Sequence, residues 1–208
     1  MGLGSFYNEQ VLPRMIDKMC GFGDMIDWRR KAVAGLHGTV LEIGFGSGLN
    51  VPVYPVEVTK VLAVEPSAVG RKLAARRIDS SPIPVEFVGL DGQSIPLDGE
   101  IADTALSTFT LCTIPDERAA LREVFRILKP GGEFHVVEHG LSNDDAVAHR
   151  QHRFEPINRK VAGGCHLTRE HWSELRDVGF DLVETSTTYA KGPRTHSFFY
   201  LGVARKPA

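Results

Sequence analysis

The sequence predicts a single α/β domain, in which a mostly parallel sheet carries helices on both faces, and its 208 residues suit one sizeable core. Short apolar runs such as Val40–Ile43, Thr59–Val64 and Asp103–Ser107 are typical of buried parallel strands. Stretches with apolar residues at helical spacing alternate with these runs. The first run breaks into glycines on alternate positions, which is typical of a turn that receives a ligand at the sheet edge.

This glycine turn lies in residues 39–50, where Val40, Leu41 and Ile43 flank an acidic residue. The residues that define it are Glu42, Gly44, Gly46 and Gly48. Glycine adopts positive φ, and it lets a ligand approach the backbone where a Cβ would clash. We expect a helix to follow, so that backbone N–H groups and a helix N-terminus face a nucleotide-type ligand.

The spacing of the glycines distinguishes between nucleotides. The dinucleotide fingerprint requires a third glycine at the position of Leu49. The Glu42 carboxylate would repel a pyrophosphate but could hold the ammonium group of an amino-acid moiety, directly or through water. With Glu-x-Gly-x-Gly-x-Gly over residues 42–48, the chain resembles the class I S-adenosylmethionine (SAM)-dependent methyltransferases. A tight strand-to-helix turn without a ligand is the alternative interpretation.

Composition favours a soluble cytoplasmic protein. The formal charge of −2 implies no strong attraction to nucleic acid. Cys20, Cys112 and Cys165 are odd in number and widely spread, so we expect neither a disulfide framework nor a zinc knuckle, which favours a reducing compartment. No uncharged apolar run reaches the roughly 18 residues that span a bilayer, so we expect no transmembrane segment. The expected partner is a small molecule, and the oligomeric state stays open.

Residues 1–36 are predicted to form N-terminal helices ahead of a methyltransferase domain at 37–208. Helical spacing over residues 6–35 is broken at Gly21–Gly23, and Pro13 indicates a late start or a kink. The resemblance implies that these helices cover the cofactor and form part of the substrate wall, with Tyr7 and Trp28 as candidate pocket residues. Packing of both aromatic side chains in the core is the competing interpretation.

The second strand, 59–64, ends at Glu65, and Pro66-Ser67 begins a basic helix. In α/β nucleotide sites an acidic residue about twenty positions beyond the glycine turn accepts the ribose hydroxyls. Glu65 stands 21 positions after Gly44 and has two oxygens for two hydroxyls. The alternative is a solvated glutamate at a strand end.

The third strand, 85–88, leads into Asp91-Gly92-Gln93. The resemblance implies that Asp91 accepts a hydrogen bond from the exocyclic amine of the adenine. Gly92 would then allow a close approach, and Gln93 would add a second contact. A plain Asp-Gly turn is the competing interpretation.

The fourth strand, 103–107, places residues 108–110 at its carboxyl end, where open α/β sheets bind ligands. The resemblance implies that this backbone, with Thr108 and Phe109, passes the methionine part of the cofactor and opens onto the acceptor pocket. By the same resemblance Phe45 and Pro66 belong to the cofactor site. Methyl transfer from a sulfonium needs no enzyme thiol, so Cys112 is expected to pack in the core.

Asp116 is predicted to cap a helix over 117–128, after which Lys-Pro-Gly-Gly leads into a fifth strand, 133–138. This helix–Leu-Lys-Pro-Gly-Gly–strand pattern is a second, independent feature of the resemblance. The strand ends at His139, the candidate general base, because the pKa of histidine lies near working pH. A structural histidine at the strand end is the alternative.

Residues 141–172 contain a helix capped by Ser142 or Asn143 and broken or kinked at Pro156. Four histidines fall here, at positions 149, 152, 166 and 171, without the spacing of a known metal site, so no metal is expected. A further helix, 169–178, is predicted to be capped by Thr168 and ended by Gly179. Strands at about 180–189 and 196–205 close the chain. The resemblance makes them an antiparallel hairpin in a Rossmann-like class I methyltransferase fold with a seven-stranded sheet.

The segments 138–140 and 163–170 resemble the methyltransferase-like thiol S-methyltransferases and their bacterial relatives, which carry a methyltransferase type 11 domain. This implies direct in-line transfer of a methyl group from SAM to a small-molecule acceptor, best a thiol, which releases S-adenosylhomocysteine. His166 is a candidate pocket residue. A quinol or a phospholipid headgroup is the alternative acceptor. A SAM-binding module without catalysis, a dinucleotide oxidoreductase and a nucleic-acid methyltransferase are remoter interpretations.

Overall fold

The structure is a computed structural model that describes residues 7–208. Residues 1–6, at the start of the predicted N-terminal segment, lie outside the described residues. The described chain forms a seven-stranded sheet in the order β3-β2-β1-β4-β5-β7-β6. The strands are β1 (Gly38–Ile43), β2 (Val58–Val64), β3 (Val85–Gly89), β4 (Ala102–Thr108), β5 (Leu128–His139), β6 (Asp181–Tyr189) and β7 (Phe198–Arg205).

The sheet confirms the predicted architecture. β1 to β5 pair in parallel, whereas β7 runs antiparallel to both β5 and β6. The sheet begins at β1 and builds outward to β3, and the chain then returns to β4 on the other side of β1. The carboxyl ends of β1 and β4 therefore flank the point where the strand order reverses, which is where open α/β sheets bind ligands.

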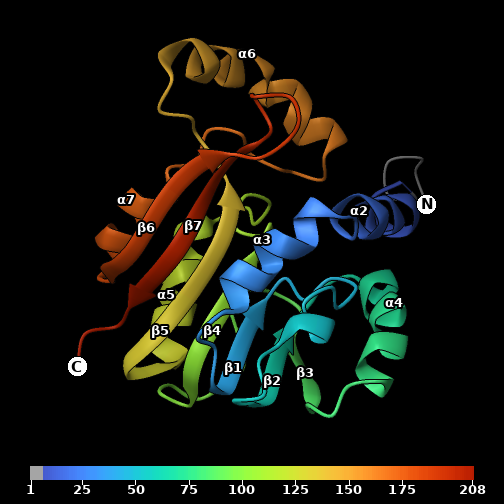
Figure 1. The fold of residues 1–208 in the computed structure, drawn as a ribbon, viewed down its shortest axis with the longest axis vertical. Coiled ribbons are helices and arrows are strands. Elements are labelled where there is room, and N and C mark those ends of the chain that lie inside the picture. The colour runs from blue at the N-terminus through green and yellow to red at the C-terminus, as the bar shows by residue number, and fades with distance from the viewer. Residues whose placement is uncertain (1–6) are drawn as a thin grey trace.

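Helices cover both faces of the sheet (Figure 1). α3 (Asp24–Val33) and α4 (Ala68–Asp79) pack on one face, against Val40, Val61 and Leu106. α5 (Glu117–Ile127) and α7 (His171–Val178) pack on the other, against Leu41 and Phe134. Successive residues of β1 thus enter opposite cores, as the two-residue period of a strand requires.

The remaining elements lie beyond the carboxyl ends of the parallel strands. η1 (Tyr7–Val11) and α2 (Leu12–Cys20) lie close to α4, and α6 (Asp145–Val161) lies above the sheet (Figure 1). Pro13 falls in the first turn of α2, which is the late start that the sequence indicated. The break at Gly21–Gly23 separates α2 from α3.

The helix predicted after the glycine turn does not form. A single 3₁₀ turn, η2 (Val51–Val53), follows instead, and β2 begins at Val58. Pro52 and Pro55 explain the difference, because proline lacks the N–H that a helix interior needs and disfavours helical backbone in the residue before it. The helix N-terminus beside the turn belongs to α4, where the Ser67 Oγ accepts from the Gly70 N–H at 3.0 Å.

Two predicted helix starts are also wrong. α6 is capped by Asp144, whose Oδ1 accepts from the N–H groups of Ala146 and Val147, rather than by Ser142 or Asn143. α7 begins at His171 without a side-chain cap, so Thr168 does not cap it. Several hydroxyl and carboxyl side chains compete at each helix start, and tertiary contacts choose among them.

Candidate active site

A cavity of about 580 Å³ lies over the carboxyl ends of β1, β2 and β4. Its floor and walls come from four loops that follow parallel strands, and α2 contributes a further wall. The residues that line it include Leu12, Pro13, Ile16, Cys20, Arg29, Gly44, Phe45, Gly46, Glu65, Pro66, Asp91, Gly92, Gln93, Thr108, Phe109, Thr113 and Gly163. Ten of the twelve residues predicted for cofactor binding therefore line one cavity, and Glu42 and Gly48 do not.

The glycine turn needs its glycines for the protein's own geometry. Gly44 has φ +71°, and a Cβ at this position would overlap the Thr110 side chain. Gly46 and Gly48 also have positive φ, at +58° and +75°. A Cβ on Gly48 would lie 3.2 Å from the Phe45 ring, which is closer than most Cβ contacts in proteins. The turn is thereby held close to the loop after β4, with its backbone facing the cavity.

Glu65 joins the glycine turn to the start of α4. Its Oε2 accepts from the Gly46 N–H at 2.6 Å and its Oε1 from the Ser67 N–H at 2.7 Å. Burial raises the pKa of Glu65, and the two backbone hydrogen bonds oppose this rise. A carboxylate has about four lone-pair sites, so two remain for donors in the cavity.

Asp91, Gly92 and Gln93 form a tight turn on the opposite wall. The Asp91 Oδ1 accepts from the backbone N–H and from the Nε2 of Gln93, at 2.9 and 2.8 Å, and these bonds lower the pKa of Asp91. The Gln93 Oε1 accepts from the Asp116 N–H at 2.9 Å, which ties the turn to the start of α5. A Cβ on Gly92 would meet Ile114 at 3.4 Å and Ala120 at 4.0 Å, both ordinary contact distances, so the protein itself does not require glycine there.

A buried polar network underlies the third wall. The Arg29 Nη1 donates to the Asn50 Oδ1 at 2.9 Å and to the Thr108 Oγ1 at 2.7 Å. The Asn50 Nδ2 donates to the Glu42 Oε1 at 2.8 Å, and the Tyr54 hydroxyl donates to the Glu42 Oε2. Burial raises the pKa of Glu42 to about 7, against the opposing effect of the Tyr54 and Asn50 hydrogen bonds.

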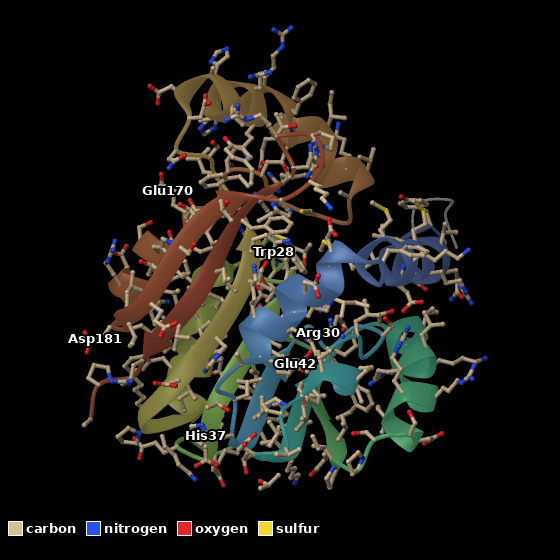
Figure 2. The ribbon with its side chains drawn as sticks, in the orientation of Figure 1. Trp28, Arg30, His37, Glu42, Glu170 and Asp181 are labelled. Atoms are coloured by element: carbon tan, nitrogen blue, oxygen red, sulfur yellow. The ribbon has the colours of Figure 1, made fainter. Side chains whose placement is uncertain are left out.

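This network places Arg29, and not the expected Glu42, at the wall of the cavity. Glu42 is 1% exposed and lies beneath α3, away from the cavity lining (Figure 2). Arg29 lines the cavity in its place, and its buried Nε has no hydrogen-bond partner among the described residues. Arg29 stands at helical spacing with Met25, Ala32 and Val33, and an arginine on this apolar face was the signal in the sequence for its contact with the cavity.

Glu138 orders the loop that follows β4. Its Oε1 accepts from the Ser107 Oγ at 2.7 Å and from the backbone N–H groups of Thr110 and Leu111, at 2.8 and 3.0 Å. Phe109, which precedes Thr110, has φ +55°, an uncommon backbone conformation for a residue with a bulky side chain. The buried carboxylate holds this strained wall of the cavity in place.

The four predicted catalytic or pocket residues lie outside the cavity lining. The His139 Nε2 lies 2.7 Å from the Cys165 Sγ, and the Tyr7 hydroxyl donates to the Val161 carbonyl at 3.1 Å. Trp28 packs edge-on against Phe199 of β7, with ring centroids 5.3 Å apart (Figure 2). The remaining one, His166, pairs through its Nδ1 with the Glu155 Oε1 at 2.6 Å, and burial lowers its pKa.

Comparison with known families and proteins locates the chain among methyltransferases. A family model described as a methyltransferase domain matches residues 41–136. Thiol S-methyltransferase TMT1B of Rattus norvegicus is 32% identical over 150 residues, which cover 70% of this chain and 61% of that protein. The phosphatidylethanolamine N-methyltransferase of Cereibacter sphaeroides is 28% identical over 116 residues, which cover 53% of this chain and 57% of that protein.

Solved structures agree on the fold. The crystal structure of a SAM-dependent methyltransferase from Aquifex aeolicus matches with a TM-score of 0.65 at 18% identity, over 93% of this chain and 98% of that chain. The chain spans about three fifths of the length of the thiol S-methyltransferase that it matches. Within residues 7–208, no helix combines the length and apolar character that a membrane crossing needs.

Proposed function

The chain is a member of the SAM-dependent methyltransferase family, and we propose that it transfers the methyl group of SAM to the sulfur of a small thiol, which releases S-adenosylhomocysteine. The observation that carries this proposal is the cavity at the ends of β1, β2 and β4, lined by the glycine turn, Glu65 and Asp91. The likeness to thiol S-methyltransferases supports the choice of acceptor.

The cavity fits the cofactor of this family in size and chemistry. Its volume of about 580 Å³ lies in the range of small-molecule sites. The free lone pairs of Glu65 suit the ribose hydroxyls, and the turn at Asp91 suits the adenine. The guanidinium of Arg29, with its unpartnered Nε, suits the carboxylate of the methionine part. We therefore assign the amino-acid end of the cofactor to Arg29 and give Glu42 a supporting role behind it.

The proposed reaction is a direct displacement at carbon. A bond forms between the acceptor sulfur and the methyl carbon while the bond from that carbon to the sulfonium breaks, and the proton of the thiol leaves to solvent. The protein aligns the acceptor with the methyl group and excludes water. The reactive form of the acceptor is its thiolate, which is already nucleophilic, so an enzyme base adds little. His139 contacts Cys165 and does not line the cavity, which agrees with a methyl transfer that needs no enzyme base.

The lining of the cavity favours a small, weakly polar acceptor. Among the described residues that line it, Arg29, Glu65 and Asp91 are the charged ones, and the proposal commits all three to the cofactor. The wall from α2 is apolar, with Leu12, Pro13 and Ile16. A phospholipid headgroup would place its phosphate without a counter-charge there. Since the described cysteines are all free thiols, we further propose that the protein works in a reducing compartment such as the cytoplasm.

The release of S-adenosylhomocysteine from purified protein and SAM tests this proposal. Small alkyl and aryl thiols, a quinol and phosphatidylethanolamine vesicles are compared in parallel, with NAD binding measured as a control. Turnover with thiols alone supports S-methylation. Turnover with the quinol or the lipid alone overturns it in favour of the other acceptor. SAM binding without turnover on any of them contradicts the thiol assignment.

A further inference from the structure

Cys112, His139 and Cys165 meet beside the cavity, although they come from three distant parts of the chain. Cys112 follows β4, His139 is the last residue of β5, and Cys165 lies in the connection between α6 and α7. The proposed methyl transfer uses none of them. We call this group the Cys-His-Cys cluster.

The two sulfurs of the cluster lie nearly at the separation found in a metal site, whereas the His139 Nε2 lies about 0.9 Å closer to the Cys165 Sγ than two ligands of one tetrahedral zinc ion do, so its ring has to shift when the ion binds. The Cys165 Sγ is 3.6 Å from the Cys112 Sγ and 2.7 Å from the His139 Nε2. All three ligand atoms lie within 4.8 Å of one another. Zinc–sulfur bonds of about 2.3 Å in a tetrahedral site separate two sulfurs by about 3.8 Å. The two thiols already stand at nearly that separation.

The cluster is buried, and one of its polar atoms has no partner in the described part of the chain. Cys112 is 1% exposed and Cys165 is 8% exposed. The buried Nδ1 of His139 has no hydrogen-bond partner among residues 7–208. Nearly all buried polar atoms in proteins are satisfied, so this exception marks His139 as a candidate for a functional role rather than a packing residue.

The backbone around the two cysteines is fixed by hydrogen bonds. The Asn158 Nδ2 donates to the Cys165 carbonyl at 2.7 Å, and the His166 N–H donates to the Cys112 carbonyl at 2.8 Å. The Glu138 Oε2 accepts from the Cys112 N–H at 3.5 Å. The two cysteines are thus held in position by residues that do not themselves belong to the cluster.

We propose that Cys112, His139 and Cys165 bind one Zn²⁺ ion. Two thiolates and one imidazole are a ligand set that zinc favours, and three protein ligands leave one tetrahedral position for water or a small thiol. The site adjoins the cavity, because Thr113 follows Cys112 directly and Gly163 stands two residues before Cys165, and both line the cavity. A spacing rule cannot reveal such a site, since each ligand comes from a different segment.

Metal titration of the reduced, full-length protein tests the site without reference to activity. The chelator-treated protein is titrated with ZnCl₂ against a chromophoric chelator, and separately with CoCl₂, where thiolate ligation produces a charge-transfer absorption. We expect one ion per chain. Cys112→Ser, Cys165→Ser and His139→Ala should each weaken Zn²⁺ binding by at least about tenfold, and the two serine variants should diminish the cobalt–thiolate absorption.

Cys20→Ser is the matched control for metal binding alone, because it removes the third free cysteine, which lines the cavity but lies outside the Cys-His-Cys cluster. It should keep both the stoichiometry and the cobalt spectrum. Wild-type protein that binds no Zn²⁺, or that shows no cobalt–thiolate absorption, overturns the proposal, as does equal loss in Cys20→Ser. Circular dichroism of each metal-free variant identifies a folding defect. A variant with such a defect is set aside, and the cobalt–thiolate absorption of the wild-type protein then decides whether the proposal holds. SAM binding, measured on the same samples, keeps this test separate from that of the proposed function.

Discussion

The carboxylate of Glu65 accepts a hydrogen bond from the backbone N–H of Gly46 at 2.6 Å, so the end of β2 and the glycine turn after β1 form one structural unit. Parallel pairing of β1 with β2 brings the two together at the same sheet edge. The group proposed for the ribose therefore also shapes the glycine turn that lines the cavity. Substitutions in either are expected to affect SAM binding beyond their own contact.

Glu65→Gln is expected to weaken SAM binding by about 10- to 100-fold, because hydrogen bonds to a charged acceptor contribute about 1.5–3 kcal/mol. The amide also cannot accept both backbone N–H groups as the carboxylate does. Isothermal titration calorimetry measures the effect. Glu86→Gln is the control, since Glu86 lies on β3, exposed and paired with Lys60 at 2.5 Å. Equal affinities of the two variants would remove Glu65 from the ribose site.

Arg29→Met is expected to weaken SAM binding at least about tenfold by removing the guanidinium proposed for the cofactor carboxylate. It should also lower the free energy of unfolding by about 1–3 kcal/mol, since the buried Asn50 Oδ1 loses its donor. Arg30→Met is the matched control, because Arg30 is the next residue of α3 and is exposed, with Asp27 as its partner at 3.0 Å. Unchanged SAM affinity in Arg29→Met with a lowered stability would give Arg29 a purely structural role.

Gly44→Ala is expected to destabilise the protein by at least about 2 kcal/mol more than Gly131→Ala. Both glycines have positive φ, +71° and +76°, which costs a side chain about 1–2 kcal/mol. A Cβ on Gly44 also overlaps Thr110, whereas a Cβ on Gly131 meets nothing within 4 Å. Urea unfolding of the two variants separates the steric effect from the backbone effect. Equal destabilisation would mean that the turn can move away from Thr110.

Glu42→Gln is expected to change the pH dependence of stability. Because burial raises the pKa of Glu42 from 4.5 to about 7, the unfolded chain ionises this group at lower pH than the folded protein does. Stability is lost as pH rises from about 4.5 to 7, by up to about 3 kcal/mol. Wild-type protein should therefore lose stability relative to Glu42→Gln between pH 5 and pH 8, measured by urea unfolding. A constant difference across this range would show that Glu42 stays ionised in the folded state.

The residues that could be placed from the sequence are those whose position follows from strand order. Glu65 and Asp91 stand directly after apolar strands, and parallel strands end at one edge, so both were expected at the cavity and both line it. The same reasoning anticipated Thr108 and Phe109. The seven-stranded sheet with its antiparallel hairpin followed from the resemblance, which the strand order confirms.

What could not be predicted depends on side chains from distant segments. Glu42 was expected to face the ligand, but Tyr54 and Asn50 engage its carboxylate from the segment that was expected to be a helix. Arg29 reaches the cavity from α3 through hydrogen bonds that span 21 and 79 positions of sequence. No local period or spacing encodes such contacts, because they form only when the elements pack together.

The most direct test of the proposed thiol S-methylation is to measure methyl transfer itself. Purified protein is incubated with SAM that carries an isotopically labelled methyl group and with a small alkyl thiol, and the products are identified by mass spectrometry. If the protein methylates thiols, we expect a labelled S-methyl thioether and S-adenosylhomocysteine in equal amounts. Glu65→Gln should reduce both products strongly, and Glu86→Gln should reduce them little. A protein that binds SAM tightly yet forms no thioether from alkyl or aryl thiols would contradict the proposed thiol S-methylation.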